Sequence, residues 1–376
     1  MLHPLQDKLS TIDGRYQKSV VKNIEILLSV LLVSRTVNLN KLKDDLPIVL
    51  NNSKLQANSC YKRLLRCVEV SAKSCLWLDI LRWAVSFIWV EVSGLYLDAT
   101  EWKFGSYPIH VLVLSGDFHG IAVPIYFRVY KHKGVLSESE RIKFMKKAMR
   151  YYDLRGKLLI ADGEFIGDEW FKYLDSKGVK LLIRLRKKQY KSLINIKQSG
   201  EDRYEKLRQK ALKKGYAKAL IEIDGTTFRI EFWRNDNPRD AKEHPVIFLI
   251  TNMLEEDKIG EKYAQRWRIE YCFKHLKTNG FNIEDIGFKK IHKLQFLIAM
   301  VIVVYILACC KGIIADKKDN AKSKWKKYKS GRIARAVSIF RMGLTLLKAT
   351  VYNIHKLRKF IFQLIRDINP KMQFVQ

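Results

Sequence analysis

Apolar residues recur at helical spacing through the first 90 or so residues, and then give way to short runs typical of β-strands. The run from Val21 to Val33 has the period of a helix with a buried face. Residues 38–46 and 52–70 are predicted as two further helices, separated by Pro47 and by the polar stretch Asn51-Asn52-Ser53. The pattern therefore predicts a helical N-terminal region over residues 1–92.

A basic stretch lies in the last of these helices. Lys62, Arg63 and Arg66 occur there among leucines, as in small helical DNA-binding modules. Any basic amphipathic helix has the same pattern, so a solvated helix face is the alternative. We interpret residues 1–92 as a DNA-binding region.

Short β-runs begin at Ser93. The first covers residues 94–98 and ends in Asp98, and runs over 110–114 and 121–130 follow, with Gly116-Asp117 as the turn between them. These spacings predict a three-stranded antiparallel meander.

Helices and strands then alternate. The predicted elements are a helix over 137–152, a strand over 157–162, a helix over 168–176 and a strand over 179–185. Ser137 and Glu140 form a capping-box pattern at the start of the first helix. Such alternation predicts an α/β layer with parallel strands, in which ligands bind at the carboxyl ends of the strands. Asp98 and Asp162 fall at such ends, where an aspartate is also common as a turn or capping residue.

The alternation of predicted helices and strands is interrupted between residues 187 and 245. Two β-runs over 217–223 and 226–233 flank Asp224-Gly225, a strong hairpin turn, and a basic stretch precedes them. We interpret residues 187–245 as a β-rich insertion. It separates two parts of the predicted α/β layer, residues 93–186 and 246–313.

Residues 314–376 are predicted to be helical and basic. The cations there are dense: Lys317, Lys318, Lys322, Lys324, Lys326, Lys327, Lys329 and Arg332. A run of this kind is commonly a solvated face, but it also suits contact with phosphates.

The segment from Leu294 to Cys310 carries no formal charge. It is at the short limit for a membrane-spanning helix, which needs about 20 apolar residues. Lys293 precedes it and Lys311 follows it, so the one-sided cationic flank of a membrane helix is lacking. We expect a helix buried on all sides in a large core, and no membrane association.

Charge and cysteine content narrow the choice of partner. Lys and Arg number 70 against 38 Asp and Glu, a formal net charge of +32. The cations are spread along the whole chain, which favours nucleic acid over an anionic membrane. The six cysteines show no metal-binding spacing and the N-terminus has no apolar signal core, so we expect a reduced, cytoplasmic protein.

One helix is predicted across residues 263–277. At about 100° per residue, four polar side chains would share one face, at roughly 0°, 300°, 340° and 320°: Tyr263, Arg266, Glu270 and Lys277. An adjacent apolar stripe would anchor the helix. An amphipathic surface helix with intrahelical ion pairs is the alternative for this segment taken alone.

Three carboxylates, Asp98, Asp162 and Glu270, come from three separate elements. Mg²⁺ prefers oxygen ligands and keeps water and phosphate in its other positions, so few protein carboxylates suffice. Two such ions about 4 Å apart would activate a water or a 3′-hydroxyl and stabilise the leaving oxygen. Arg266 and Lys277 would then hold the scissile phosphates.

The chain resembles DDE-type insertion-sequence transposases of the IS-four branch. Their third motif is Tyr, two residues, Arg, three residues, Glu, six residues and Lys, and four residues match every interval: Tyr263, Arg266, Glu270 and Lys277. The sequences around the two aspartates, residues 97–105 and 161–167, are also similar.

The resemblance implies a ribonuclease H-like catalytic core interrupted by a β-rich insertion and flanked by helical N- and C-terminal regions. It implies cut-and-paste transposition: hydrolysis at the ends of the element with two Mg²⁺ ions, for which Mn²⁺ can substitute, and then attack of the freed 3′-hydroxyl on target DNA. Asp98, Asp162 and Glu270 match the metal-binding catalytic acids. Tyr263, Arg266 and Lys277 match the DNA contacts. The expected partners are the terminal inverted repeats, target DNA and a second copy of the chain, at the nucleoid in the cytoplasm.

Gly163 departs from the family pattern. Relatives with the same second motif often carry an arginine directly after the acid. Loss of a cation beside a metal ligand weakens the support for that ligand. The alternative function is therefore a catalytically impaired, transposase-derived DNA-binding protein.

Overall fold

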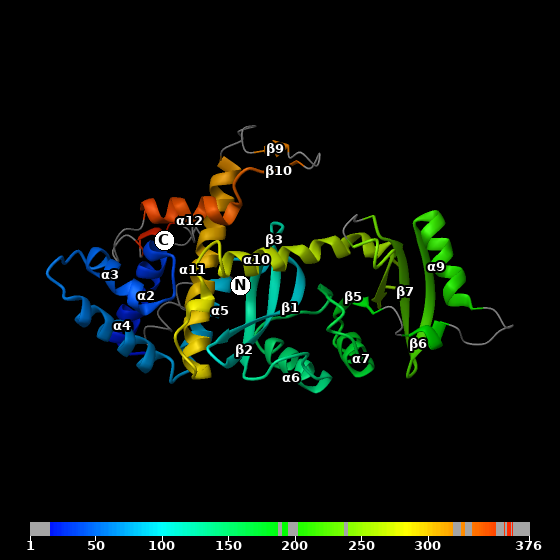
Figure 1. Ribbon diagram of the computed structural model, residues 1–376, viewed down its shortest axis with the longest axis horizontal. Helices are drawn as coiled ribbons and strands as arrows, with labels where there is room; N and C mark the ends of the chain where they lie inside the picture. Colours follow the sequence, from blue (N-terminus) through cyan, green and yellow to red (C-terminus); the bar gives the residue numbers. More distant parts are fainter. Residues whose placement is uncertain are drawn as a thin grey trace, which may run out of the picture.

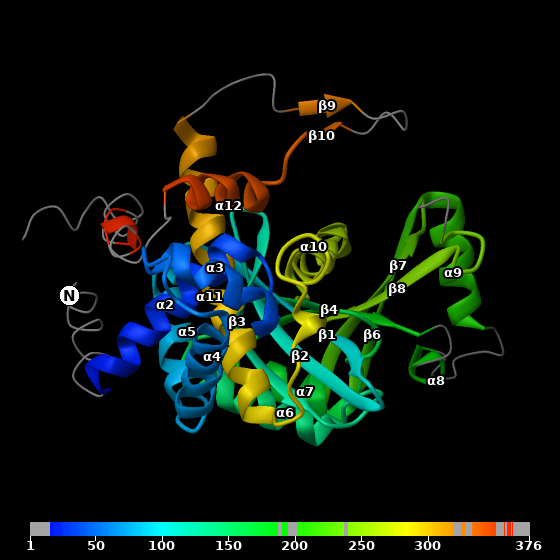
Figure 2. The same cartoon turned by 60° about the vertical axis from the view of Figure 1, so that its left-hand side comes forward.

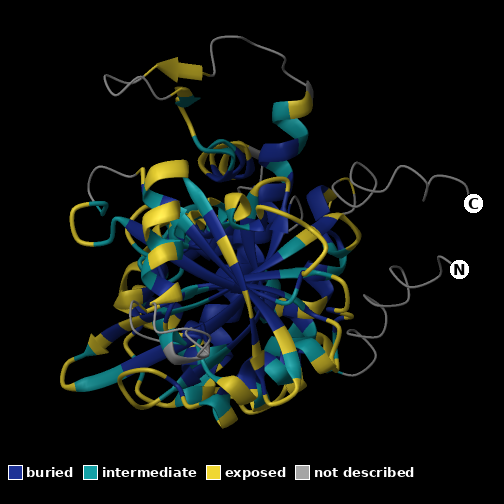
Figure 3. Cartoon of the chain, turned by 90° about the vertical axis from the view of Figure 1, so that its right-hand side faces the viewer, coloured by how far each residue is buried: buried dark blue, intermediate teal, exposed yellow. Residues whose placement is uncertain are grey.

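The computed structural model describes residues 16–186, 190–194, 202–236, 240–318, 325–327, 333–350, 357, 359–361 and 363. Its centre is an eight-stranded mixed sheet in the order β3-β2-β1-β4-β5-β8-β7-β6. The strands are β1 (Val92–Phe104), β2 (Tyr107–Phe118), β3 (Ile121–Tyr130), β4 (Leu158–Ala161), β5 (Lys180–Leu185), β6 (Tyr216–Ile223), β7 (Thr226–Arg234) and β8 (Val246–Thr251). Figure 3 shows the buried residues gathered in the strands at the centre of the molecule.

The antiparallel meander β1-β2-β3 is confirmed, but two of its predicted boundaries are wrong. β1 does not end at Asp98, because its residues stay paired with β2 as far as Phe104 opposite Tyr107. Gly116-Asp117 lies inside β2, and the turn falls at His119 and Gly120, which both have positive φ. Asp98 is therefore a residue within a strand.

The predicted parallel layer is also confirmed. β1 pairs in parallel with β4, and β4 with β5. Two helices connect these strands: α6 (Glu138–Ala148), with the predicted capping box at Ser137 and Glu140, and α7 (Asp168–Ser176). Figures 1 and 2 show α6 and α7 on one side of the sheet and α10 (Trp267–Leu276) on the other.

The region over 187–245 extends the same sheet. β6 and β7 form the predicted hairpin, with Asp224 and Gly225 at positive φ in the turn. β7 pairs with β8, which pairs with β5, so the hairpin continues the core sheet. The basic stretch is α9 (Arg203–Lys214), which packs against β6 and β7, and the four-residue helix α8 (Lys191–Ile194) lies beside it.

From residue 16 onward the N-terminal region is helical, as predicted, and residues 1–15 of the predicted region lie outside the described residues. It contains α2 (Lys18–Ser34), α3 (Leu39–Val49), α4 (Ala57–Ser71) and α5 (Leu76–Ser86), followed by the short 3₁₀ helix η1 (Trp89–Glu91). Pro47 does not end α3, because the buried Leu46 and Val49 hold its last turn against the core. α4 begins at Ala57, five residues after the predicted start.

The apolar segment forms α11 (Ile291–Lys318). It is long and apolar enough to cross a membrane, but 89% of its most apolar window is buried within the fold. α2, α4, α5, α12 (Ile339–Thr350) and β3 pack around it. The approach of α12 is close: a Cβ on Gly343 would lie 1.8 Å from the carbonyl oxygen of Ala308. The expectation of a buried core helix is therefore confirmed.

The C-terminal region is only partly helical. Between α11 and α12 lie two short paired strands, β9 (Trp325–Lys327) and β10 (Ile333–Arg335), and Figure 1 shows them projecting from the end of α11. A bidentate ion pair between Arg335 and Asp316 holds β10 to α11. Several predicted cations lie outside the described residues: Lys322, Lys324, Lys329 and Arg332.

Candidate active site

The two aspartates come from adjacent parallel strands. Leu97 of β1 is opposite Ala161 of β4, so Asp98 and Asp162 each directly follow this paired position on the two neighbouring strands. Each carboxylate accepts a hydrogen bond from the backbone N–H that follows it: Ala99 N to Asp98 Oδ1 at 2.8 Å and Gly163 N to Asp162 Oδ1 at 2.6 Å. The strand register therefore brings together residues 64 positions apart in the chain.

The third motif is not a single α-helix, so the prediction of one shared face is wrong. Residues Ile259–Arg266 form a 3₁₀ helix, η2, and α10 begins only at Trp267. η2 packs against β4 and β5, whereas the apolar stripe that supports an α-helix starts at Ile269. The change of pitch turns Tyr263 toward Asp162, and the Tyr263 hydroxyl donates to Asp162 Oδ1 at 3.4 Å.

Lys277 lies just past the end of α10, with non-helical backbone angles of φ −85° and ψ −109°. Its Nζ is 2.8 Å from a carboxylate oxygen of Glu284 and donates to the backbone oxygen of Glu101 at 3.3 Å. Lys277 therefore contacts β1 beyond Asp98 and is not among the partners of the three acids.

Arg266 joins the acids. Its guanidinium lies 2.6 Å from Glu270 Oε1 and 3.7 Å from Asp98 Oδ2. The side chain is buried, with only 10% of its surface exposed. Asp98 of β1 and Glu270 of α10 thus contact one guanidinium, whereas Asp162, at the end of β4, contacts the Tyr263 hydroxyl of η2.

The electrostatics agree with this arrangement. The pKa of Asp98 is raised to about 7: burial is the main cause and Asp162 and Glu270 add to the rise, while the Ala99 N–H and Arg266 oppose it. Burial by itself would lower the pKa of Arg266, but Tyr263 and the three acids raise it above its usual value. Burial and Asp162 also raise the pKa of the Tyr263 hydroxyl. Asp162 and Glu270 are therefore both close enough to act on Asp98 through space.

Three carboxylates supply the oxygen ligands that Mg²⁺ and Mn²⁺ prefer, so the donor chemistry fits a divalent cation. In the described part of the chain, however, no group of three or more acids, histidines or cysteines is close enough to hold a metal as the side chains stand. The Arg266 guanidinium lies between Asp98 and Glu270 and neutralises them. A metal bound by both acids would have to displace it.

A cavity of about 520 Å³ opens beside Asp162. Its wall is formed by the end of β5, by α9 and by the chain before β8, and it carries the cations Arg184, Arg186 and Arg208. A Cβ on Gly163 would lie 3.4 Å from the Arg184 oxygen and 3.6 Å from Arg186 Cγ, which is ordinary contact. The backbone therefore leaves room for a side chain at Gly163, and Arg186 stands beside the position of the missing family arginine.

The start of η2 is held by a buried ion pair that the sequence analysis did not identify. Glu231 of β7 accepts a hydrogen bond from Gly260 N at 2.8 Å and pairs with Arg229 at 2.9 Å. Arg229 donates in turn to the Leu254 oxygen at 2.8 Å. This ion pair could have been predicted from the sequence, because Arg229 and Glu231 are the charged residues in the otherwise apolar stretch Phe228–Phe232.

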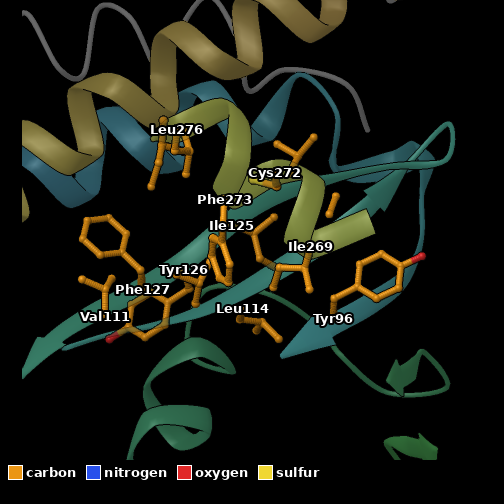
Figure 4. Close-up of a cluster of buried hydrophobic side chains, with 14 of the residues drawn as sticks. Tyr96, Val111, Leu114, Ile125, Tyr126, Phe127, Ile269, Cys272, Phe273 and Leu276 are labelled. Carbon is orange, nitrogen blue, oxygen red and sulfur yellow. The ribbon is translucent and has the colours of Figure 1, made fainter. Parts of the chain in front are cut away.

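The orientation of α10 comes from its apolar face. Figure 4 shows this face packed on the meander strands of the sheet. The labelled residues are Ile269, Cys272, Phe273 and Leu276 on the helix and Tyr96, Val111, Leu114, Ile125, Tyr126 and Phe127 on the strands. This packing leaves Glu270 on the flank of the helix that meets Arg266.

His275, near the end of α10, is expected to make stability depend on pH. Burial lowers its pKa from 6.5 to about 4, with a smaller effect from Lys274, and its ring packs against Phe340. Between pH 6.5 and 4 the unfolded state binds a proton that the folded state does not. The free energy of unfolding therefore decreases as the pH is lowered through this range. The contribution is about 1–3 kcal/mol. Urea unfolding of wild type and His275→Gln across this range should show a shallower decline in the variant, and parallel declines would contradict the assignment.

The match to a protein family covers the whole candidate site. A model described as "Transposase DDE domain" matches residues 97–307, more than half of the chain. The chain belongs to the transposase DDE domain family. These transposases are phosphoryl-transfer enzymes and generally use divalent metal ions. The matched span contains all six predicted site residues.

No match was found among curated proteins. Among solved structures, the chain is similar to a piggyBac transposase in a synaptic complex with hairpin DNA, studied by cryo-electron microscopy. The two are 11% identical with a TM-score of 0.49, and the match covers 99% of this chain and 78% of the other. A likeness this low supports no inference about function.

Proposed function

We propose that this protein cuts and pastes an insertion sequence, with Asp98, Asp162 and Glu270 as its catalytic, metal-binding acids. The observation that carries the proposal is that Arg266 contacts Asp98 and Glu270 directly, while Tyr263, three residues before it, donates to Asp162. The parallel pairing of β1 with β4 supports a ribonuclease H-like core. The matching intervals from Tyr263 to Lys277 support the IS-four branch.

The roles of the residues follow from their contacts. Bound divalent ions would supply Lewis-acid activation of the attacking oxygen and stabilise the leaving oxygen. Arg266, once released from the carboxylates, is placed to donate charge-assisted hydrogen bonds to the scissile phosphate. Tyr263 orients Asp162 through its hydroxyl. Lys277, beyond the acids on the β1 side, would contact DNA further along the strand.

The direct test is cleavage of DNA that carries the terminal inverted repeats of the element, in Mg²⁺ or Mn²⁺. End-specific cleavage, followed by joining of the 3′-hydroxyl to a target duplex, is the expected result. Binding of the same DNA without cleavage would favour the second candidate, a catalytically impaired DNA-binding protein, for which the observation is Gly163. Crosslinking of the protein on paired ends would test the expected homodimer.

The N-terminal helices are proposed to bind DNA through α4. Lys62, Arg63 and Arg66 are exposed there, beside a groove of about 630 Å³ between α2 and α4. Replacing all three with glutamine should make the slope of log affinity against log salt shallower by about 2.7, because each lost phosphate contact removes about 0.9.

The matched control for that measurement replaces three exposed lysines of α6, Lys143, Lys146 and Lys147, with glutamine. Both variants lose the same charge. An equal change of slope in the two would contradict a DNA contact by α4 and indicate a general charge effect.

A further inference from the structure

A second polar cluster lies beneath α10, apart from the acids. Asp117 of β2 is 5% exposed and accepts a hydrogen bond from the Tyr96 hydroxyl at 2.7 Å. Arg268 of α10 forms an ion pair with Asp117 and donates to the Tyr96 hydroxyl at 3.0 Å. The other oxygen of Asp117 accepts from Gly120 N at 2.9 Å in the β2–β3 turn. We call Tyr96, Asp117 and Arg268 the clamp.

The clamp joins the two elements that carry Asp98 and Glu270. Tyr96 is two residues before Asp98, so their side chains leave the same face of β1. Arg268 is two residues before Glu270 in the first turn of α10, about 200° away around the helix axis. Holding Arg268 therefore sets the rotation of the helix, and with it the direction in which Glu270 points.

Between its two capping residues, α10 otherwise contacts the sheet through apolar side chains. Figure 4 shows Tyr96 below the start of the helix, with its hydroxyl directed out of the apolar cluster. Apolar burial is non-directional, so it holds a helix on a sheet without fixing its rotation closely. A charge-assisted ion pair with a shared phenol has a defined geometry. The clamp is thus a directional contact of α10 with β1 and β2, in addition to those that Arg266 and Lys277 make with β1 at the two ends of the helix.

We propose that Arg268, Asp117 and Tyr96 are positioning residues that fix Glu270 relative to Asp98 for metal binding. The proposal rests on the proposed function, because it takes Asp98 and Glu270 as metal ligands. The hydrogen bonds and ion pairs of the clamp side chains join them to one another, to Gly120 and to Gln265, and not to Asp98, Asp162 or Glu270. They act on the distance between two carboxylates that belong to different elements.

Mn²⁺ binding to the full chain without DNA, followed by electron paramagnetic resonance, tests this directly. Arg268→Gln removes a positive charge near the site, and charge alone would therefore tighten Mn²⁺ binding. Loss of positioning has the opposite sign and should weaken binding about 10-fold, the lower end of the range for residues that orient ligands. Arg268→Lys, which keeps the charge and one donor, should recover part of the loss.

Two further variants separate positioning from folding. Tyr96→Phe changes no charge and should weaken Mn²⁺ binding less than Arg268→Gln does. Arg335→Gln breaks a peripheral arginine–aspartate pair of similar exposure and should leave Mn²⁺ affinity unchanged. Amide hydrogen exchange should be faster in Trp267–Leu276 of Arg268→Gln than in wild type. The exchange rate in α11 should be the same in the two proteins.

Unchanged or tighter Mn²⁺ binding by Arg268→Gln would overturn the positioning role of the clamp and leave the proposed function intact. Equal weakening by Arg335→Gln would overturn it too, because the effect would then reflect lost stability. Failure of the wild-type chain to bind Mn²⁺, with or without DNA, would instead overturn the metal-dependent function, and the clamp with it.

Discussion

Replacing Asp98 with asparagine is expected to lower metal-dependent DNA cleavage by about 10³-fold, equivalent to about 4 kcal/mol of transition-state stabilisation. Asparagine keeps the shape of the side chain and an oxygen for the Ala99 N–H, which the native Oδ1 accepts at 2.8 Å. It loses the negative charge that a divalent cation requires. Single-turnover cleavage of labelled end DNA measures the effect without interference from product release.

The same preparation should bind DNA with nearly wild-type affinity, because Asp98 adds a negative charge and no phosphate contact. Asp153→Asn is the control, since it removes an exposed acid that pairs with Arg155 on the surface. Cleavage by Asp98→Asn at the wild-type rate would show that these acids do not carry the chemistry. An equal loss in Asp153→Asn would show that the loss reflects general damage.

Arg266→Gln is expected to change metal binding and cleavage in opposite directions. The guanidinium neutralises Asp98 and Glu270, at 3.7 and 2.6 Å, so its removal should tighten Mn²⁺ binding by about 10-fold, or 1.4 kcal/mol. The same change removes the donor placed for the scissile phosphate. Cleavage at saturating Mn²⁺ should therefore fall by about 10²–10³-fold.

Lys277→Gln is the matched control for Arg266→Gln. It removes one cation of the same motif, but Lys277 pairs with Glu284 and lies away from the three acids. Its Mn²⁺ affinity should stay close to the wild-type value. Unchanged or weaker Mn²⁺ binding in Arg266→Gln would mean that the guanidinium does not compete with the metal. Equal tightening in both variants would indicate a long-range charge effect.

Sequence patterns predicted the local elements well where periodicity and capping are strong. The meander, the helix capped by Ser137 and the hairpin at Asp224-Gly225 each follow from short-range preferences for backbone angles and burial. Asp98 and Asp162 were identified in a similar way, as carboxylates at the ends of apolar runs, and Glu270 from the spacing of polar residues along 263–277. Their roles stay predictions that the experiments above test.

Boundaries and faces were less accurate, because they depend on partners far away in the chain. β1 continues past Asp98 since β2 pairs with it to Phe104. The motif from Tyr263 to Lys277 changes from a 3₁₀ helix to an α-helix because η2 packs on β4 and β5. Periodicity alone gave one pitch for the whole segment and therefore placed Lys277 with the acids.

The sequence by itself determined the α/β alternation, the buried character of α11 and the four-residue motif with its intervals. Each of these features depends on residues that are close together in the chain. Only the tertiary structure decided that Arg266 lies between Asp98 and Glu270 and that Arg268 meets Asp117. It also decided that β6 and β7 extend the core sheet. The physical reason is that ion pairs and strand register between distant segments depend on how complete elements pack, and no local spacing encodes that packing.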